Sequence, residues 1–191
     1  MSESPPAPAP IDGADFFLGI VAARYNGELV DALLARVTQV LREHGVRERN
    51  IEILRVPGSN EIPYVAHMLA ATGEFDCLIA LGVVLSGETS HHEVISYGTA
   101  YSLHSIGMQS EIPVINGILT VNSVEQARER ITGAHDRGAE FARAALEMAQ
   151  HKLKLVERLD ELEDEKEDFD EEEDEDDEDE GFDPKQLFKN N

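Results

Sequence analysis

The sequence predicts a three-layer α/β domain, in which a parallel sheet of four strands lies between helices. Four short apolar runs lack the polar alternation of half-exposed strands, which is typical of strands covered on both faces. Stretches with helical spacing of apolar residues separate these runs. The order β-α-β-α-β-α-β-α-α therefore indicates right-handed crossovers that place helices on both faces of one sheet.

The strands and the first two helices follow one another in order. We expect the strands at the apolar runs 16–23, 51–56, 75–85 and 112–120. The first helix has an apolar stripe over 29–41 and ends at Gly45. The second helix covers about 62–69, with Pro63 in its first turn and Gly73 past its end.

Three further helices complete the pattern. The third helix covers about 93–106. Ser123 opens the fourth, and Gln126, three residues later, is placed to form a capping box. The last helix has its apolar positions over 141–148 and leads into an acidic segment.

Acidic residues are concentrated at the end of the chain. The 191 residues include 39 acidic and 16 basic ones, for a net charge of -23. Residues 151–191 carry 20 acidic and 6 basic side chains, or -14, which leaves -9 for residues 1–150. The run 160–180 has almost nothing apolar to bury, and repulsion among its carboxylates should keep it extended and solvated. We therefore expect a globular domain at 14–155 and a disordered acidic tail at 156–191.

Net charge, apolar runs and cysteine count argue against several classes of function. So negative a chain repels phosphate backbones, which argues against nucleic-acid binding. Residues 1–13 are a flexible, Pro-rich leader without the basic and apolar segments of a secretory signal. The longest apolar run, 77–85, is far below the roughly 20 residues of a membrane helix. With Cys77 as the single cysteine, no intrachain disulfide can form, and we expect a soluble cytoplasmic protein.

We expect polar clusters at the carboxyl ends of all four strands, although the fourth cluster falls inside the apolar run 112–120. Ligands of a parallel α/β sheet bind beyond the carboxyl ends of its strands. The clusters are residues 23–26, 56–63, 85–93 and 115–117. Turn formation explains each cluster taken singly, because Gly, Asn, Ser and Pro favour turns. Four clusters expected at one edge of the sheet favour a binding site instead.

The third cluster contains a candidate phosphate site. Gly87 lets the backbone turn closely, and the first amides of the following helix have no intrahelical partner. A phosphate fits in front of these amides, with the hydroxyl of Thr89 as a further donor. Arg130 or Arg137 could balance the phosphate charge, although both arginines also fit solvated positions.

His91 and His92 follow this turn directly. The dipole at a helix N-terminus favours the neutral imidazole, which suits a histidine to proton exchange near neutral pH. A surface pair without a role is the alternative. A metal site is less favoured, because adjacent residues do not share a helical face and no cysteine or third histidine has ligand spacing to them.

Several motifs together resemble one enzyme family. They are residues 56–63 (VPGSNEIP), 80–91 (ALGVVLSGETSH), 113–120 (PVINGILT) and 125–130 (EQARER). The order and spacing of these motifs, over about residues 14–150, resemble those of 6,7-dimethyl-8-ribityllumazine synthase. This is the penultimate enzyme of riboflavin biosynthesis. Each motif alone is modest, but the whole set in register is specific.

The resemblance implies a flavodoxin-like subunit in a homo-oligomer with active sites between neighbouring subunits. The family forms pentamers, and twelve pentamers sometimes join as a hollow icosahedral shell of 60 subunits. The implied transferase reaction condenses 5-amino-6-(D-ribitylamino)uracil with 3,4-dihydroxy-2-butanone 4-phosphate and releases phosphate and water. Such chemistry needs two oriented substrates, a phosphate cradle and proton transfer. The resemblance implies no metal and no organic cofactor, and riboflavin synthase is a candidate protein partner.

The resemblance also assigns roles to individual residues. Tyr25 takes the place of the ring that stacks on the pyrimidine, and Asn116 occupies a ring-contacting position reached from the neighbouring subunit. The residues implied for the ribitylamino-uracil are Tyr25, Ser59, Asn60, Glu61, Val83, Val84, Leu85 and Asn116. The residues implied for the butanone phosphate are Glu88, Thr89 and Arg130, with Arg137 as a supporting contact. His91 is the implied proton-transfer residue.

Three positions depart from the family pattern. An aromatic residue is usual where Asn60 and Asn116 stand, and a basic or polar one, such as Arg or Lys, where Ser86 stands. Amides in place of rings reduce the stacking surface, so the alternative is a catalytically weakened paralogue that forms shells or binds flavin or lumazine. A response-regulator-like module is a third alternative, but it needs an acidic pocket that residues 22–24 do not offer.

The acidic tail has two interpretations. A solubilising, non-assembling extension is the simpler one. The tail ends with a segment whose Phe182, Leu187 and Phe188 could anchor on a partner, so a docking segment is the alternative.

Overall fold

The computed structural model describes the backbone of residues 10–177 and the side chains of residues 10–166. The chain divides into two units, Met1–Leu153 and Lys154–Asn191. The described range holds four strands and five α-helices in the order that the sequence predicts. Two short 3₁₀ turns are additional. No helix in this range is both long and apolar enough to span a membrane.

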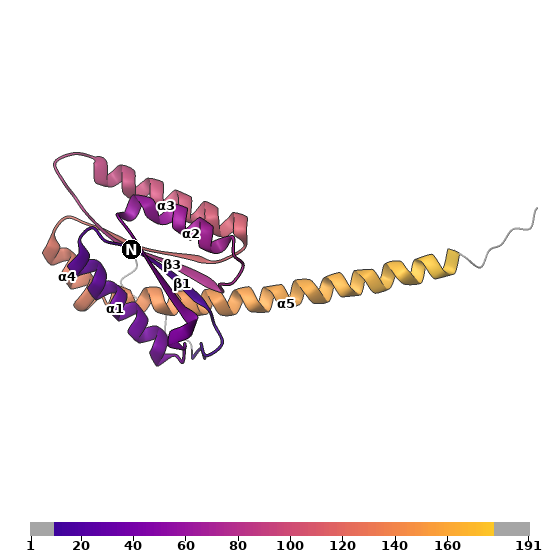
Figure 1. The fold of residues 1–191 in the computed structure, drawn as a ribbon. Helices are drawn as coiled ribbons and strands as arrows, with labels where there is room; N and C mark the ends of the chain where they lie inside the picture. Colours follow the sequence, from indigo (N-terminus) through magenta and orange to yellow (C-terminus); the bar gives the residue numbers. More distant parts are fainter. Residues whose placement is uncertain (1–9, 178–191) are drawn as a thin grey trace, which may run out of the picture. The chain divides into compact units, whose positions relative to one another are not determined.

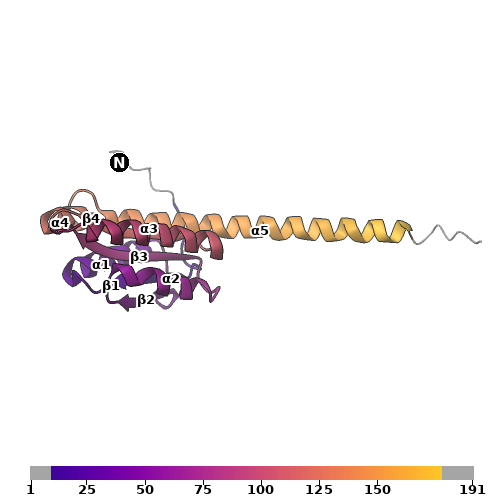
Figure 2. The same cartoon turned by 90° about the horizontal axis from the view of Figure 1, so that it is seen from above.

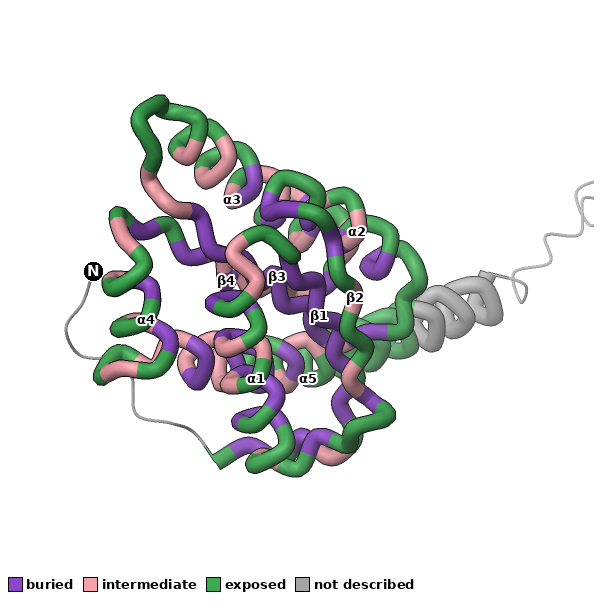
Figure 3. The backbone as a smooth tube through the Cα atoms, turned by 60° about the vertical axis from the view of Figure 1, so that its left-hand side comes forward, coloured by how far each residue is buried: buried purple, intermediate pink, exposed green. Residues whose placement is uncertain are grey.

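All four strands pair in parallel in one sheet, which confirms the predicted fold class. They are β1 (Leu18–Ala23), β2 (Ile51–Val56), β3 (Cys77–Leu85) and β4 (Val114–Val121), in the order β2-β1-β3-β4 (Figure 2). The central strands β1 and β3 are almost wholly buried (Figure 3). Coverage is incomplete at the edge strands β2 and β4, which hold half-buried and exposed residues, and Ile53 of β2 is exposed.

Helices cover both faces of the sheet, so the domain has the three predicted layers. The helices are α1 (Gly27–Glu43), α2 (Ile62–Ala70), α3 (His91–Ser110), α4 (Val124–Thr132) and α5 (Arg137–Asp177). On one face α2 and α3 bury Ile62 and Leu103 (Figure 1). On the other face α1, α4 and the first part of α5 bury Leu33, Ile131 and Leu146.

The start of α4 confirms the predicted cap in a shifted form. The Ser123 hydroxyl accepts a hydrogen bond from the amide of Gln126 at 3.1 Å. The Gln126 side chain accepts from the amide of Asn122 at 2.7 Å, one residue earlier than in a capping box. At the end of α1, Gly45 has a φ of +88°, a value that favours a residue without Cβ.

The acidic segment differs from the expectation of an extended chain over 160–180. The backbone stays helical as far as Asp177, and all side chains of 153–166 are exposed. The helix continues one that is already folded, so it needs no new nucleus, and its Glu, Leu, Lys and Arg residues are good helix formers. Disorder of the tail stays a prediction, and Phe182, Leu187 and Phe188 lie outside the described residues.

Candidate active site

The carboxyl ends of β1, β2 and β3 lie together at one edge of the sheet. The amide of Arg24 donates to the carbonyl of Val56 at 2.8 Å, which ties the end of β1 to that of β2. The side-chain amide of Asn26 donates to the carbonyl of Val83 at 2.8 Å, which ties β1 to β3. Tyr25 stands between these two links and is 75% exposed. Its ring is therefore free to stack on a planar ligand.

The turn after β2, η2 (Ser59–Glu61), packs closely against β3. Ser59 is buried, and a Cβ on Gly82 would lie 2.4 Å from the Ser59 hydroxyl oxygen, so a larger residue at 82 would displace that hydroxyl. The carboxylate of Glu61 accepts a hydrogen bond from the amide of Gly58 at 2.8 Å. Asn60 is exposed between them. The turn thus presents an amide and a carboxylate beside Tyr25, whose ring lies close to Gly58.

The end of β3 leads directly into the predicted phosphate cradle. Val83 and Val84 are buried, and Leu85 is half-buried. The amide of Ser86 donates to the carbonyl of Val121 at 2.8 Å and so anchors the start of the loop to β4. The loop side chains from residue 87 to 90, which include Glu88 and Thr89, are exposed in front of the first turn of α3. The unpaired amides of a helix start and the Thr89 hydroxyl can bind an anion there.

The two neighbouring histidines differ in their surroundings. His91 is exposed, and no hydrogen bond to its ring is found among the described residues. Both ring nitrogens of His92 have partners: Nδ1 lies 3.0 Å from the carbonyl oxygen of Thr89, and Nε2 lies 3.3 Å from the hydroxyl of Ser86. His91 is therefore free to meet a ligand, whereas His92 is tied to the loop. The sequence could not predict which of the two histidines has hydrogen-bond partners, because that depends on how the loop folds.

The two predicted arginines lie in the layer of α4 and α5. Arg130 is half-buried on α4, and it forms no ion pair within the part of the chain that the structure describes. Arg137 is the first residue of α5 and pairs with Glu140. The sheet separates this layer from α3 (Figure 1). No described contact brings Arg130 to Thr89 within one subunit.

Asn116 does not lie at the carboxyl end of its strand, so this part of the sequence prediction was wrong. It is the third residue of β4 and pairs in register with Ala80, in the first half of β3. The apolar run continues beyond Gly117 and extends the strand to Val121. The Asn116 side-chain oxygen accepts from the amide of Ile118 at 3.1 Å. Asn116 thus lies on an edge strand, apart from the other candidate residues.

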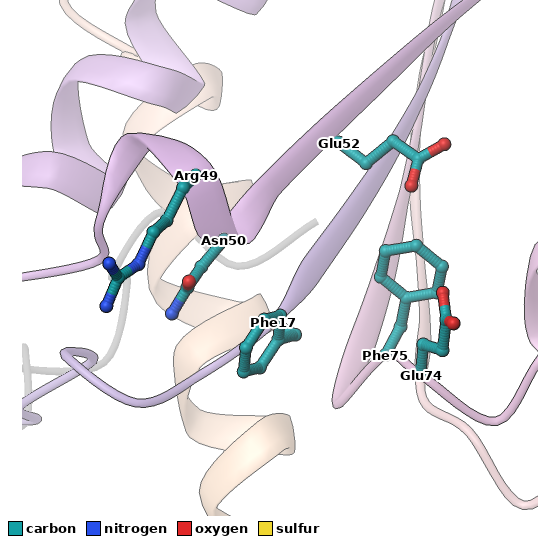
Figure 4. Close-up of a pocket in the computed structure, with 6 residues that line it drawn as sticks. All are labelled: Phe17, Arg49, Asn50, Glu52, Glu74 and Phe75. Carbon is teal, nitrogen blue, oxygen red and sulfur yellow. The ribbon is translucent and has the colours of Figure 1, made fainter.

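A pocket of about 480 Å³ lies elsewhere, near the amino ends of β1 and β2 and the start of β3. Figure 4 shows its two phenyl rings between an arginine on one side and two glutamates on the other. The lining residues are Phe17, Arg49, Asn50, Glu52, Glu74 and Phe75. None of them is a predicted site residue. Among the described residues, no three His, Cys, Asp or Glu side chains are grouped as ligands of a metal ion.

Comparison with known proteins assigns the family. Residues 15–152 match the sequence profile of 6,7-dimethyl-8-ribityllumazine synthase. The chain belongs to this family. A relative of that name from Nitrosospira multiformis is 40% identical over 153 residues, which cover 80% of this chain and 91% of the relative. Relatives of the same name from Xylella fastidiosa and Nitrosomonas europaea are each 41% identical, over 73% and 80% of this chain and 89% of each relative.

The family match ends where the compact unit ends. The last matched residue is 152, and the boundary between the two units follows Leu153. All the candidate site residues lie within the match. The acidic residues beyond it belong to a segment that the family profile does not include.

Proposed function

We propose that the protein is a 6,7-dimethyl-8-ribityllumazine synthase. It condenses 5-amino-6-(D-ribitylamino)uracil with 3,4-dihydroxy-2-butanone 4-phosphate, and phosphate and water are released. One observation supports this best: the three strand ends hold an exposed ring, a turn with a carboxylate and an anion-binding helix start at one edge. These are the features that two oriented substrates and a phosphate leaving group require.

The ribitylamino-uracil binds across the ends of β1 and β2. Its planar ring stacks on Tyr25, which is 75% exposed. Glu61 accepts hydrogen bonds from ribityl hydroxyl groups, because one of its oxygens already receives the Gly58 amide and is held in place. Asn60 and Ser59 belong to the same turn, while the backbone of 83–85 meets the uracil edge.

The butanone phosphate binds at the start of α3, where its phosphate faces the loop with Glu88 and Thr89. A dianion needs a cation as well as amides. No described contact joins Arg130 to the cradle of its own subunit, so the arginine comes from α4 of a neighbouring subunit. This agrees with sites between subunits, to which Asn116 on the edge strand β4 also contributes.

His91 transfers the protons of the reaction. Imine formation, phosphate elimination and ring closure each move a proton, and an imidazole can carry it near neutral pH. His91 stands directly after the cradle, exposed, at the first position of α3. Its proton therefore reaches a substrate whose phosphate lies on the same helix start.

The protein forms a homo-oligomer through the outer face of α2 and α3. This layer exposes large apolar side chains that a lone subunit leaves in water. They are Tyr64, Met68, Val94, Tyr97, Tyr101 and Met108. A pentamer buries such a face, and twelve pentamers give a shell of 60 subunits. Native mass and negative-stain microscopy distinguish the pentamer from the shell, and a monomer at micromolar concentration contradicts both.

The direct test mixes the purified protein with both substrates and follows the lumazine chromophore. Turnover above the uncatalysed condensation is expected, and its absence would reject the proposal. His91→Ala should lower kcat by about 10²- to 10⁴-fold while ligand binding stays nearly intact. His151→Ala, an exposed histidine on α5, is the matched control and should have no effect.

Arg130→Ala should mainly raise the KM for the butanone phosphate. Mixing subunits with Arg130→Ala and subunits with His91→Ala tests whether sites are shared, because some mixed sites then regain both residues. Recovered activity supports an arginine from the neighbour, and no recovery contradicts it. A KM change confined to the ribitylamino-uracil would contradict the placement of Arg130.

The second candidate function is a paralogue that binds flavin or lumazine without making it. Asn60 and Asn116 favour this alternative, because both are amides where the family usually has rings. Tight lumazine binding without turnover in the same assay would select it.

A further inference from the structure

We propose that His92 is a positioning residue for the phosphate cradle. Its imidazole bridges the two sides of the loop after β3 and holds the loop in its anion-binding shape. The inference rests on the proposed function, in which this loop receives the phosphate. It assigns distinct roles to adjacent histidines: His91 meets the substrate, and His92 shapes the site.

The bridge has two sides. On one side Nε2 lies 3.3 Å from the hydroxyl of Ser86, and on the other Nδ1 lies 3.0 Å from the carbonyl oxygen of Thr89. A carbonyl can only accept, so Nδ1 carries a proton, and the Nε2 of a neutral ring accepts from the Ser86 hydroxyl. The ring thus joins Ser86, the first residue after β3, to Thr89, the residue that faces the phosphate.

The loop has little else to hold it. The side chains from 87 to 90 are exposed, and a Cβ on Gly87 would meet open space. Backbone hydrogen bonds hold only its ends within the described structure: Ser86 donates to Val121, and the carbonyl of Ser90 accepts from the amides of Glu93 and Val94. The His92 ring is therefore the side chain that connects the middle of the loop to its start.

His92 itself is held firmly enough to act as a fixed point. Its carbonyl accepts a hydrogen bond from the hydroxyl of Ser96 at 2.7 Å, one turn further along α3. The Ser96 hydroxyl also lies 2.7 Å from that of Thr120 on β4. The amide of Ser86 donates to the carbonyl of Val121, the next residue of β4. His92 and Ser86 are therefore both held against the carboxyl end of β4.

Loss of the bridge should affect one substrate selectively. A loop that samples several shapes must be ordered when the phosphate binds, and that ordering weakens binding. The ribitylamino-uracil binds at the ends of β1 and β2 and does not need the loop. His91 remains in place, so the chemical steps should continue once both substrates are bound.

The test measures KM for each substrate and kcat in full-length variants. His92→Phe keeps a ring but removes both bonds, and it should raise the KM for the butanone phosphate about tenfold. The other KM and kcat should stay within about twofold. His92→Asn can still donate to Thr89 and should recover part of the loss. His151→Phe, on the other face of the sheet, is the matched control.

A double-mutant cycle tests the Ser86 contact. Ser86→Ala should raise the same KM by itself but add little in the His92→Phe background, because the two residues form one unit. Independent effects would contradict the bridge. An unchanged phosphate-substrate KM in His92→Phe, or equal changes in both KM values, would overturn the inference.

A binding measurement separates this inference from the proposed function. Inorganic phosphate is titrated into the wild-type protein and His92→Phe without any substrate, and binding is followed by calorimetry. Weaker binding in the variant supports the bridge even if the wild type makes no lumazine. Equal binding in the two proteins, or no binding to the wild type, overturns it even if the wild type is an active synthase.

Discussion

The two parts of α5 have similar helical backbones but opposite surroundings. Up to residue 153 the helix packs on the sheet, and Leu146 is fully buried together with the small residues Ala139, Ala142, Ala145 and Ala149. Over residues 154–166 it exposes its large apolar side chains, with Leu155 58% and Leu159 57% accessible. Packing therefore stabilises the first part, whereas the second extends a helix that is already formed.

The first part is also fixed at both ends. The guanidinium of Arg36 on α1 binds the carboxylate of Asp136 through two nitrogens, at 2.6 and 2.9 Å. Asp136 caps α5, because its backbone and side-chain oxygens accept from the amide of Ala139. At the far end, the Lys152 ammonium donates to the carbonyl of Phe75 at 2.8 Å. No comparable anchor is found over residues 154–166.

Leu146→Ala should give the largest effect. It removes a fully buried side chain from the core between α5 and the sheet, and such changes cost about 2–5 kcal/mol. Urea unfolding followed by circular dichroism measures the loss as a lower midpoint. A loss below about 1 kcal/mol would mean that this face of α5 is not part of the cooperative core.

Asp136→Asn should have a smaller effect that depends on pH. Arg36 lowers the pKa of the Asp136 carboxyl, chiefly through their hydrogen bonds. A carboxyl with a lowered folded pKa stabilises the protein above its unfolded pKa, about 4, and this contribution is lost as the pH falls through the folded pKa. Asparagine keeps the cap, so the variant should lose about 0.5–1 kcal/mol at pH 7.

The loss should shrink as the pH falls below about 4, where the wild type also loses the charge. Unfolding midpoints of both proteins at pH 7 and pH 3 provide the measurement. A difference that stays constant with pH would show that the Arg36 contact does not stabilise the fold through the Asp136 charge.

Much of the domain could be predicted because its signals are local. Apolar runs placed all four strands, and Ser123 and Gln126 placed the start of α4, since a cap depends on a few neighbouring residues. The convergence of three strand ends followed from the parallel order alone. The links between them could not be predicted, because the Asn26 contact with Val83 joins residues that are 57 positions apart.

The structure differs from the sequence prediction at Asn116 and in the acidic segment, and the prediction did not give His92 a role. Asn116 was placed at a strand end because Asn and Gly favour turns, but its edge strand continues through the following apolar residues. The role of His92 depends on how a short loop folds, which composition does not encode. For residues 160–177 we expected charge repulsion to prevent regular structure. The segment is helical, because it extends the helix α5 and needs no new nucleus.

Leu159→Ala provides the direct counterpart of Leu146→Ala. The same substitution in the exposed part of the helix removes no packed contact, so the free energy of unfolding should change by no more than about 0.5 kcal/mol. The two variants are compared under identical conditions. A loss as large as that of Leu146→Ala would mean that Leu159 is buried against another subunit or another part of the chain.

Truncation after Leu153 should have the smallest effect on the enzyme. The shortened chain keeps the compact unit, the whole family match and all candidate site residues. It loses all 20 acidic residues of the segment 151–191, and with them more than half of the net charge of -23. We expect unchanged kcat, KM and native oligomer size, together with lower solubility, because like charges keep particles apart. A changed oligomer size would show that the second part of α5 takes part in assembly, and loss of a bound partner would favour docking over solubilisation.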